Sequence, residues 1–241
     1  MCIRDRYNNG LTLLGAYTWS KLIDNGSPGG EVSYLGENPG LQNFNNRRLE
    51  RSLGSQNIPH RFVTSYVYEL PFGSGKRFAT GVRGFSKLLI DGWQINGITR
   101  LQSGIPLSLR TASNPTLGTL GVGTLRPDNN GRSAKLDGPT VDRLNNYFDV
   151  TVFSQPGPFR FGNTARTLPD VLSPGVVNFD FSAIKNTRVE RFNIQFRAEA
   201  FNALNNTNFG LPGVTFGAPG FGAISSAAPA RIIQLGLKLY Y

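Results

Sequence analysis

The chain has 241 residues and a formal net charge of +10, with 25 lysines and arginines against 15 aspartates and glutamates. Charged residues are only 17% of the sequence and aromatic residues are 11%, which excludes a disordered charged tail. One cysteine and one histidine exclude a disulfide scaffold, a cysteine-ligated zinc site and any site that needs two imidazoles. No run of about 18 apolar residues is present, which argues against a transmembrane helix. The many glycines, asparagines and aromatic residues favour an all-β chain.

Residues 1–6 are interpreted as a non-native leader. They form a charged start without the apolar core of a signal peptide, and they resemble translated adapter sequence at the open 5′ end of a gene assembled from environmental DNA. An ordinary disordered N-terminus is the alternative. On the leader interpretation, residues 7–241 are the C-terminal part of a longer protein.

Six segments alternate between apolar and polar side chains with a period of two, which predicts β-strands. In chain order they are residues 11–21, 61–70, 93–101, 179–183, 191–201 and 231–241. Leu107 and Leu109 continue the alternation of the third segment beyond a bend at residues 104–106, which predicts one long, kinked strand. Residues 147–153 carry a weaker strand signal and leave room for a further pair.

The connections between these strands alternate between long and short. Residues 22–60, 111–175 and 202–230 form the long ones, whereas residues 71–91 and 187–190 form shorter ones. Outer-membrane β-barrels show this asymmetry, with long extracellular loops, short periplasmic turns and strands that are apolar outside and polar inside. The pattern therefore predicts an antiparallel, up-and-down transmembrane β-barrel whose three long connections are extracellular loops.

The predicted barrel is incomplete. The sequence supports about six to eight strands, and six strands cannot close because the smallest membrane barrels have eight. The alternative is a smaller complete barrel, or a soluble β-sandwich, that acts as a binding or adhesion module. Alternation of side chains alone does not separate these possibilities, because soluble sandwiches alternate in the same way.

Aromatic side chains near the predicted strand ends are candidates for an interfacial girdle, because Trp and Tyr rings favour the bilayer surface. These residues are Tyr17, Trp19, Trp93, Phe192 and Tyr240. Packing in the core of a soluble β domain is the alternative.

Residues with catalytic or ligand-binding potential form no recognisable motif. Residues 73–77 resemble a phosphate loop but lack its first glycine and the hydroxyl residue after the lysine, so a turn is favoured. Residues 128–131 resemble a calcium loop without its distal glutamate, so a polar turn is favoured. His60 has no second histidine and adjoins a predicted strand start. We therefore expect no catalytic, cofactor-binding or metal-binding residues, and a protein that is not an enzyme.

Basic residues are spread over both ends of the predicted strands. They include Arg47, Arg48, Arg51, Arg77, Arg83, Lys87, Arg188 and Arg191. No basic helix or aromatic-interleaved motif accompanies them, so nucleic acid is not an expected partner. Arginines in the loops can pair with lipopolysaccharide phosphates, which makes lipopolysaccharide and outer-membrane lipid the expected partners. A merely solvated basic surface is the alternative.

Several segments resemble TonB-dependent outer-membrane receptors, particularly the Oar-like members that carry a carboxypeptidase-regulatory-like domain at the N-terminus. The segments, which occur in the family's order, are residues 17–21, 60–73, 92–97, 102–106, 196–209 and 234–241. The resemblance covers nearly all of residues 7–241 and implies a 22-stranded barrel with an N-terminal plug. This chain would supply roughly the last third of that barrel.

The resemblance also implies a function and further partners. The function would be uptake of an unidentified substrate across the outer membrane, energised by the TonB system through the missing N-terminal part. The family's last strand is the recognition signal for the barrel-assembly machinery. Leu235, Leu237, Leu239 and Tyr241 match that alternating signal, although the family more often ends on Phe.

Overall fold

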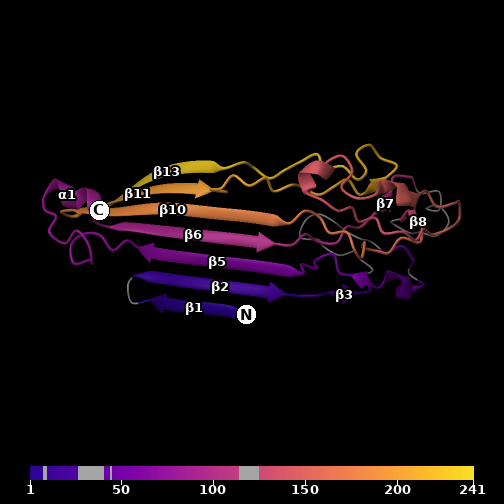
Figure 1. The fold of residues 1–241 in the computed structure, drawn as a ribbon, viewed down its shortest axis with the longest axis horizontal. Coiled ribbons are helices and arrows are strands. Elements are labelled where there is room, and N and C mark those ends of the chain that lie inside the picture. The colour runs from indigo at the N-terminus through magenta and orange to yellow at the C-terminus, as the bar shows by residue number, and fades with distance from the viewer. Residues whose placement is uncertain (8–9, 27–40, 44, 114–124) are drawn as a thin grey trace.

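The computed structural model describes residues 1–7, 10–26, 41–43, 45–113 and 125–241. In this part of the chain the main feature is a sheet of seven strands in the order β1-β2-β5-β6-β10-β11-β13, each antiparallel to its neighbours. Figure 1 shows these strands side by side, with short connections at one end and long loops at the other. Their bounds are β1 Cys2–Tyr7, β2 Leu11–Trp19, β5 His60–Glu69, β6 Trp93–Gln102, β10 Val176–Val189, β11 Phe192–Phe201 and β13 Ile232–Tyr240.

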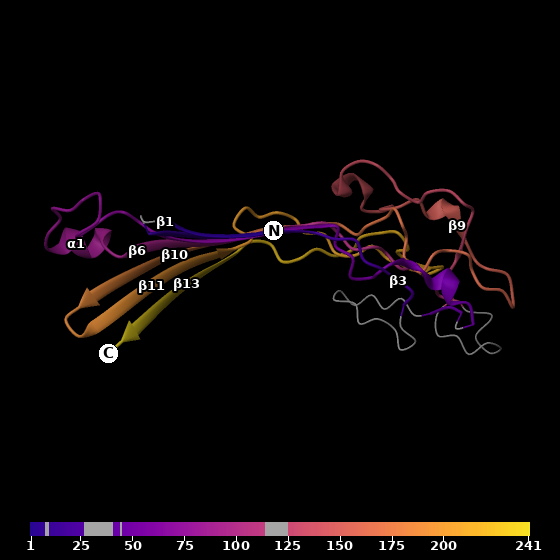
Figure 2. The same cartoon turned by 90° about the horizontal axis from the view of Figure 1, so that it is seen from below.

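The sheet is a single open layer. Each of its strands pairs with the next sheet strand along the chain, and β1 and β13 are the two edges. Seen from its side in Figure 2, the layer is thin and bends away toward β13, and the described residues place no second sheet against either face. A sandwich needs two sheets packed face to face, so the described residues do not form the sandwich of the alternative prediction.

Strand register gathers the apolar side chains of neighbouring strands on one side of the sheet. Leu13 lies opposite Tyr66, Tyr66 opposite Gly97, and Gly97 opposite Phe181, so one apolar row crosses four strands. We call this side the apolar face. Its larger members are Leu11, Leu13, Tyr17, Trp19, Phe62, Tyr66, Tyr68, Trp93, Ile95, Leu101, Val177, Phe179, Phe181, Phe192, Ile194, Phe196, Ile233, Leu235, Leu237 and Leu239.

The opposite side, the polar face, carries most of the hydrogen-bonding side chains of the strands. It includes Arg61, Glu69, Gln94, Asn96, Arg100, Gln102, Asn178, Asp180, Asn193, Gln195, Arg197, Glu199, Gln234 and Lys238. On strands β2 to β13 of the sheet, the apolar face holds a single Asp, Glu, Lys or Arg, namely Lys185. The two faces therefore differ as the alternation in the sequence predicts.

The long connections fold together into a unit that we call the loop cap, formed by the described residues within 20–59, 103–175 and 202–231. Its regular elements are short: β3 Ile23–Asp24 pairs with β4 Ser52–Leu53, β7 Arg110–Thr111 with β12 Thr215–Phe216, and β8 Asp128–Asn129 with β9 Phe153–Ser154. Three single-turn helices, η1 Arg47–Glu50, η2 Thr140–Arg143 and η3 Val150–Val152, lie between them. The one α-helix of the described residues, α1 Phe85–Ile90, lies at the other end, between β5 and β6.

The buried hydrophobic core of the described residues lies in the loop cap. It contains Leu107, Leu109, Ala134, Tyr147, Phe148, Val152, Phe153, Leu168, Val171, Val214 and Ile224. Phe148 is fully buried, and its ring meets Phe153 and Phe221 edge-on at centroid distances of 6.0 and 5.3 Å. On the sheet, by contrast, Leu235 and Leu237 are 68% and 72% exposed. The sheet therefore presents apolar surface outward, which a water-soluble sheet would cover.

The six predicted strands correspond to β2, β5, β6, β10, β11 and β13, but two further strand predictions are wrong. β6 ends at Gln102, and Leu107 and Leu109 are buried in the core of the loop cap, so the long kinked strand does not form. Residues 147–153 contain η3 and only the start of β9. An apolar alternation can thus arise from packing in a loop core as well as from a strand.

A seventh strand lies in the segment interpreted as a leader. The backbone of β1 pairs antiparallel with β2, from Cys2 opposite Ala16 to Tyr7 opposite Leu11. This pairing describes the backbone only and does not bear on the origin of residues 1–6, which stays a prediction.

Candidate functional site

The polar face meets the loop cap at a pocket of about 430 Å³. Adjacent strands β6 and β10 supply Arg100 and Asn178, which are direct register partners, and β10 also supplies Asp180. An Asp180 carboxylate oxygen accepts a hydrogen bond of 2.9 Å from the backbone N–H of Asn202 in the loop after β11. The pocket thus holds an exposed guanidinium, a carboxylate and amide groups at one place. Such a set can bind a polar ligand by several directed hydrogen bonds.

The same loop after β11 is also joined to the start of β10. Asn208 accepts a hydrogen bond of 2.8 Å from the backbone N–H of Val177 and donates one of 3.1 Å to the Val177 carbonyl. The side chain of Asn208 therefore makes the two backbone hydrogen bonds that a neighbouring strand would make with Val177 at the start of β10. These two hydrogen bonds join β10 to the loop after β11, and both segments line the pocket.

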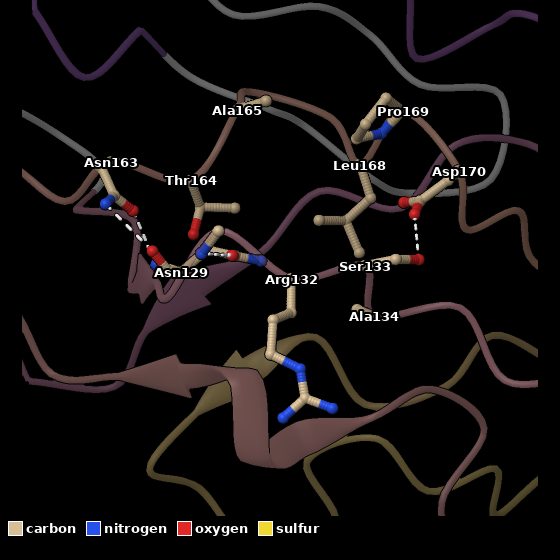
Figure 3. A pocket seen from close by; sticks show the side chains of 11 residues that line it. Asn129, Arg132, Ser133, Ala134, Asn163, Thr164, Ala165, Leu168, Pro169 and Asp170 are labelled. Atoms are coloured by element: carbon tan, nitrogen blue, oxygen red, sulfur yellow. Dashed lines mark hydrogen bonds between the residues drawn. The ribbon is translucent and has the colours of Figure 1, made fainter.

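Another pocket, of about 440 Å³, lies within the loop cap itself (Figure 3). The backbone N–H of Asn129 donates to the Asn163 side chain at 2.6 Å, and the Asn163 amide donates back to the Asn129 carbonyl at 3.0 Å. Across the pocket, the Ser133 hydroxyl donates to the Asp170 carboxylate. Leu168 contributes an apolar wall between the two polar groups. Pockets of this mixed character suit ligands with both hydroxyl and apolar surfaces.

A buried ion pair connects two of the loops. Glu50 and Arg126 are 0% and 3% exposed, and the Glu50 Oε1 to Arg126 Nη2 distance is 2.8 Å. The backbone N–H groups of Gln42 and Asn43 also donate to Glu50 Oε1, each at 3.2 Å. Burial lowers the pKa of Arg126, and the adjacent Glu50 carboxylate opposes that shift. The pair is enclosed and holds the loops together, so it is unavailable to an external ligand.

Arg166 makes a parallel connection. Its Nε donates to the Glu50 carbonyl at 3.0 Å, and its guanidinium forms an ion pair with Asp24. The neighbouring Thr167 hydroxyl donates to the Leu53 carbonyl at 2.7 Å. The first long loop is therefore joined to the second by charged and neutral hydrogen bonds together.

The two-faced sheet and the loop cap at one end of it can be compared with known protein families. The family model described as "Outer membrane beta barrel domain" matches residues 1–234. The chain belongs to this family. No curated protein and no solved structure matches it. Among the described residues, no helix is long and apolar enough to cross a membrane.

Membership of this outer-membrane barrel family assigns an environment to each face. In such barrels the apolar face contacts lipid and the polar face lines the interior. The exposure of Leu235 and Leu237 then has a physical reason, since hydrocarbon chains cover them. The pocket at Arg100 and Asp180 lies on the interior side, below the loops. The chain is thus a wall of an outer-membrane barrel with a folded cap.

Four of the five residues predicted for the aromatic girdle lie on the lipid-facing side. Tyr17 and Trp19 lie at the loop end of β2, and Trp93 and Phe192 begin strands at the opposite end. Tyr240 is the exception, because it pairs with Asn193 on the polar face, and its place in the interfacial girdle stays a prediction. Successive side chains of a strand point to opposite faces, and Tyr240 directly follows Leu239, which lies on the lipid-facing side. Contact of the other four with the bilayer surface stays a prediction.

His60 belongs to the same loop-end aromatic group. It starts β5, as predicted, and lies opposite Trp19. The Tyr17 hydroxyl forms a hydrogen bond of 2.8 Å with His60 Nδ1, and the two rings stack with centroids 6.3 Å apart. His60 is therefore engaged with a neighbouring ring on the lipid-facing side.

The residues predicted as the barrel-assembly signal lie on the edge strand. Leu235, Leu237 and Leu239 share the lipid-facing side of β13, with 65–72% of each exposed. Tyr241 follows the strand, and its ring packs against Phe192 at 5.5 Å, with the Arg191 guanidinium 4.8 Å from its centroid. One backbone edge of β13 has no partner strand in the described chain. Recognition by the assembly machinery stays a prediction.

The motifs weighed for catalysis or metal binding have structural partners. Residues 73–77 form a turn in which Lys76 pairs with Glu69 at 2.9 Å. Asp128 forms an ion pair with Arg160 and accepts a hydrogen bond of 3.1 Å from the backbone N–H of Asn163. Within the described ranges, no group of three His, Cys, Asp or Glu side chains lies close enough to hold a metal ion.

Sequence reasoning missed Arg100, Asp180 and the buried ion pair, whereas Asn129 and Gly131 of the loop-cap pocket lie in the segment 128–131 that was considered as a calcium loop. Arg100 and Asp180 occupy polar positions of predicted strands, so the alternation alone could have marked them as interior. Glu50 and Arg126 carry no such signal, because their contact depends on how two long loops fold against one another.

Proposed function

We propose that this chain is the C-terminal part of a TonB-dependent receptor barrel that takes up a polar substrate, and that it is not an enzyme. The seven strands support a place in a larger barrel, because membrane barrels have at least eight. The segments that resemble the receptor family fall on β2, β5, β6, β11 and β13 and on their ends.

The observation that carries the proposal is the interior pocket at Arg100 and Asp180. A transported molecule passes from the loops to the interior wall, and this pocket lies where those two parts meet. The guanidinium of Arg100 and the carboxylate of Asp180, which both line it, suit a substrate with both acceptor and donor groups. The folded cap above it supplies a surface for first capture.

Partners follow from the same arrangement. Arg47, Arg48 and Arg51 are exposed at the loop end, where lipopolysaccharide phosphates would lie beside an extracellular loop. The β13 edge would pair with the barrel-assembly machinery during insertion. The TonB system would act through the receptor's N-terminal part.

Binding to TonB tests the proposal. The protein encoded by the complete natural gene is purified in detergent and titrated with the soluble periplasmic domain of TonB in a calorimeter. We expect saturable binding, and low ion conductance in planar bilayers because a plug fills the barrel. If the natural protein lacks TonB binding, and residues 7–241 form a stable closed pore by themselves, a small independent barrel replaces the receptor.

A further inference from the structure

The helix α1, between β5 and β6, exposes large apolar side chains. Phe85, Leu88 and Leu89 are 74%, 40% and 55% exposed. Their spacing of three and four positions places them on one side of the helix. The free energy of such a cluster in water rises with the apolar surface that it exposes. The helix therefore presents an apolar side that has no cover among the described residues.

The end of α1 is attached to the lipid-facing side of the barrel wall. Trp93 lies on that side, and its indole Nε1–H donates to the Leu89 carbonyl at 2.8 Å. Lys185, the register partner of Trp93, donates from its ammonium group to the Asp91 carbonyl at 2.6 Å. The Lys185 Nζ also lies 5.4 Å from the Trp93 ring centroid. Two side chains of the lipid-facing side thus hold the end of the helix.

Lys185 indicates the level at which this attachment lies relative to the bilayer. On strands β2 to β13 of the sheet it is the single Asp, Glu, Lys or Arg of the lipid-facing side, and its ammonium group is directed to the turn beyond the strand end. Lysines near a membrane surface direct their charge toward the headgroups in this way. The level of Asp91 is therefore the level of the bilayer surface.

The connection that contains α1 is also basic. Between the two strands it carries Lys76, Arg77, Arg83 and Lys87 against Asp91 alone. Lys76 is engaged by Glu69, whereas Arg77, Arg83 and Lys87 are exposed. An apolar side with adjacent cations is the composition of helices that lie in the surface of a bilayer.

We propose that α1 is an interfacial anchor that lies in the leaflet surface at the short-turn end of the barrel. Phe85, Leu88 and Leu89 enter the acyl region, and Arg83 and Lys87 contact lipid phosphates. The occupant is the phospholipid bilayer, because α1 adjoins the lipid-facing side through Trp93. In this family the short turns face the periplasm, so the leaflet is the inner one. The inference depends on family membership and not on TonB-dependent uptake.

Spin-label accessibility tests the depth of the helix. In a cysteine-free background, the variants Phe85→Cys and Leu89→Cys are labelled with a nitroxide in the complete protein in phospholipid nanodiscs. Phe159→Cys is the matched control, because Phe159 is also 74% exposed but belongs to the loop cap. We expect the labels at 85 and 89 to collide more with oxygen and less with a water-soluble nickel chelate than the label at 159. Equal nickel collisions at the three sites would overturn the proposal.

The charged part of the proposal has its own test. Label depth at residue 85 is compared in phosphatidylcholine nanodiscs and in nanodiscs that contain phosphatidylglycerol, with and without Arg83→Glu and Lys87→Glu. We expect a deeper label in the anionic lipid, and the loss of that difference in the double variant. A label depth that is independent of lipid charge in the unaltered sequence would overturn the assignment of these cations to lipid phosphates.

Discussion

The carboxylate of Glu50 and the guanidinium of Arg126 meet at 2.8 Å in the interior of the loop cap, although 76 positions separate them in the sequence. Both side chains are almost completely buried, and Glu50 Oε2 has no hydrogen-bond partner among the described groups. Removing one ion of a buried pair leaves the other without compensation in a poorly solvated place. The pair therefore makes the loop arrangement sensitive to the loss of either partner.

Arg126→Met is expected to destabilise the loop cap by about 3–5 kcal/mol, because Glu50 would stay buried without its counter-ion. The measurement is the urea dependence of protease cleavage in the long loops, with the protein in detergent micelles. Lys135→Met is the control, since Lys135 lies 3.9 Å from Asp137 on the surface with 61% of its side chain exposed. The control should change stability by less than about 1 kcal/mol. Equal effects of both substitutions would contradict the structural role of the buried pair.

Phe148→Ala is expected to cost the loop cap about 3–5 kcal/mol, because a fully buried ring leaves a cavity among packed aromatic neighbours. Phe159→Ala removes an equally large side chain from the surface of the same unit and should change stability by less than about 0.5 kcal/mol. The loss is measured as the midpoint of loop cleavage in urea. Equal losses of stability from the two substitutions would contradict a packed core in the loop cap.

Asp149 predicts a pH dependence at the start of η3. Its carboxylate accepts hydrogen bonds from the Thr151 hydroxyl at 2.6 Å and the Thr151 backbone N–H at 2.9 Å, and these bonds lower the pKa of Asp149. A lowered folded pKa means that the stabilisation is present above the ordinary carboxylate pKa and is lost as pH falls through the folded value. Thr151→Val should return the pKa partly toward its ordinary value, as followed by NMR titration. An unchanged titration in the variant would show that the hydroxyl bond does not stabilise the carboxylate.

Gly97 and Gly15 both lie on the lipid-facing side, yet they should respond differently to a side chain. A Cβ at Gly97 would lie 2.4 Å from the Tyr66 ring, whereas a Cβ at Gly15 meets nothing within 4 Å. Gly97→Ala should therefore displace Tyr66 and cost about 1–3 kcal/mol. Gly15→Ala should be neutral or stabilise by up to about 1 kcal/mol, because alanine loses less backbone entropy than glycine when the strand forms. Unfolding in detergent, followed by tyrosine fluorescence, distinguishes them, and equal stability would contradict the close packing at Gly97.

The strands and their faces could be predicted from sequence because period-two alternation is a local signal. The assignment of Leu235, Leu237 and Leu239 to one side of β13 needed only their own spacing, and register bears it out. The same alternation gave a wrong strand prediction at Leu107 and Leu109, whose side chains are buried in the core of the loop cap. Local periodicity therefore identifies a buried or lipid-covered side, but not what covers it.

The loop cap and α1 were outside the reach of sequence reasoning for a different reason. Contacts such as Arg166 with Asp24, or Tyr147 with the Leu172 carbonyl at 2.8 Å, join segments whose approach depends on the whole cap. The helix α1 is only six residues long, too short for a periodic pattern to emerge. Its attachment through Trp93 became visible only with the register of β6 and β10.

The central claim is that one face of the sheet contacts lipid and the other lines the barrel interior. Leu237→Arg and Gln234→Arg place the same charge on opposite faces of β13, and protease-resistant protein in the outer membrane is measured for each in the complete natural gene product. We predict that Leu237→Arg, opposite Phe196, costs about 2–4 kcal/mol and severely lowers assembled protein, whereas Gln234→Arg assembles normally. Normal assembly of Leu237→Arg, or failure of Gln234→Arg alone, would contradict the assignment of the two faces.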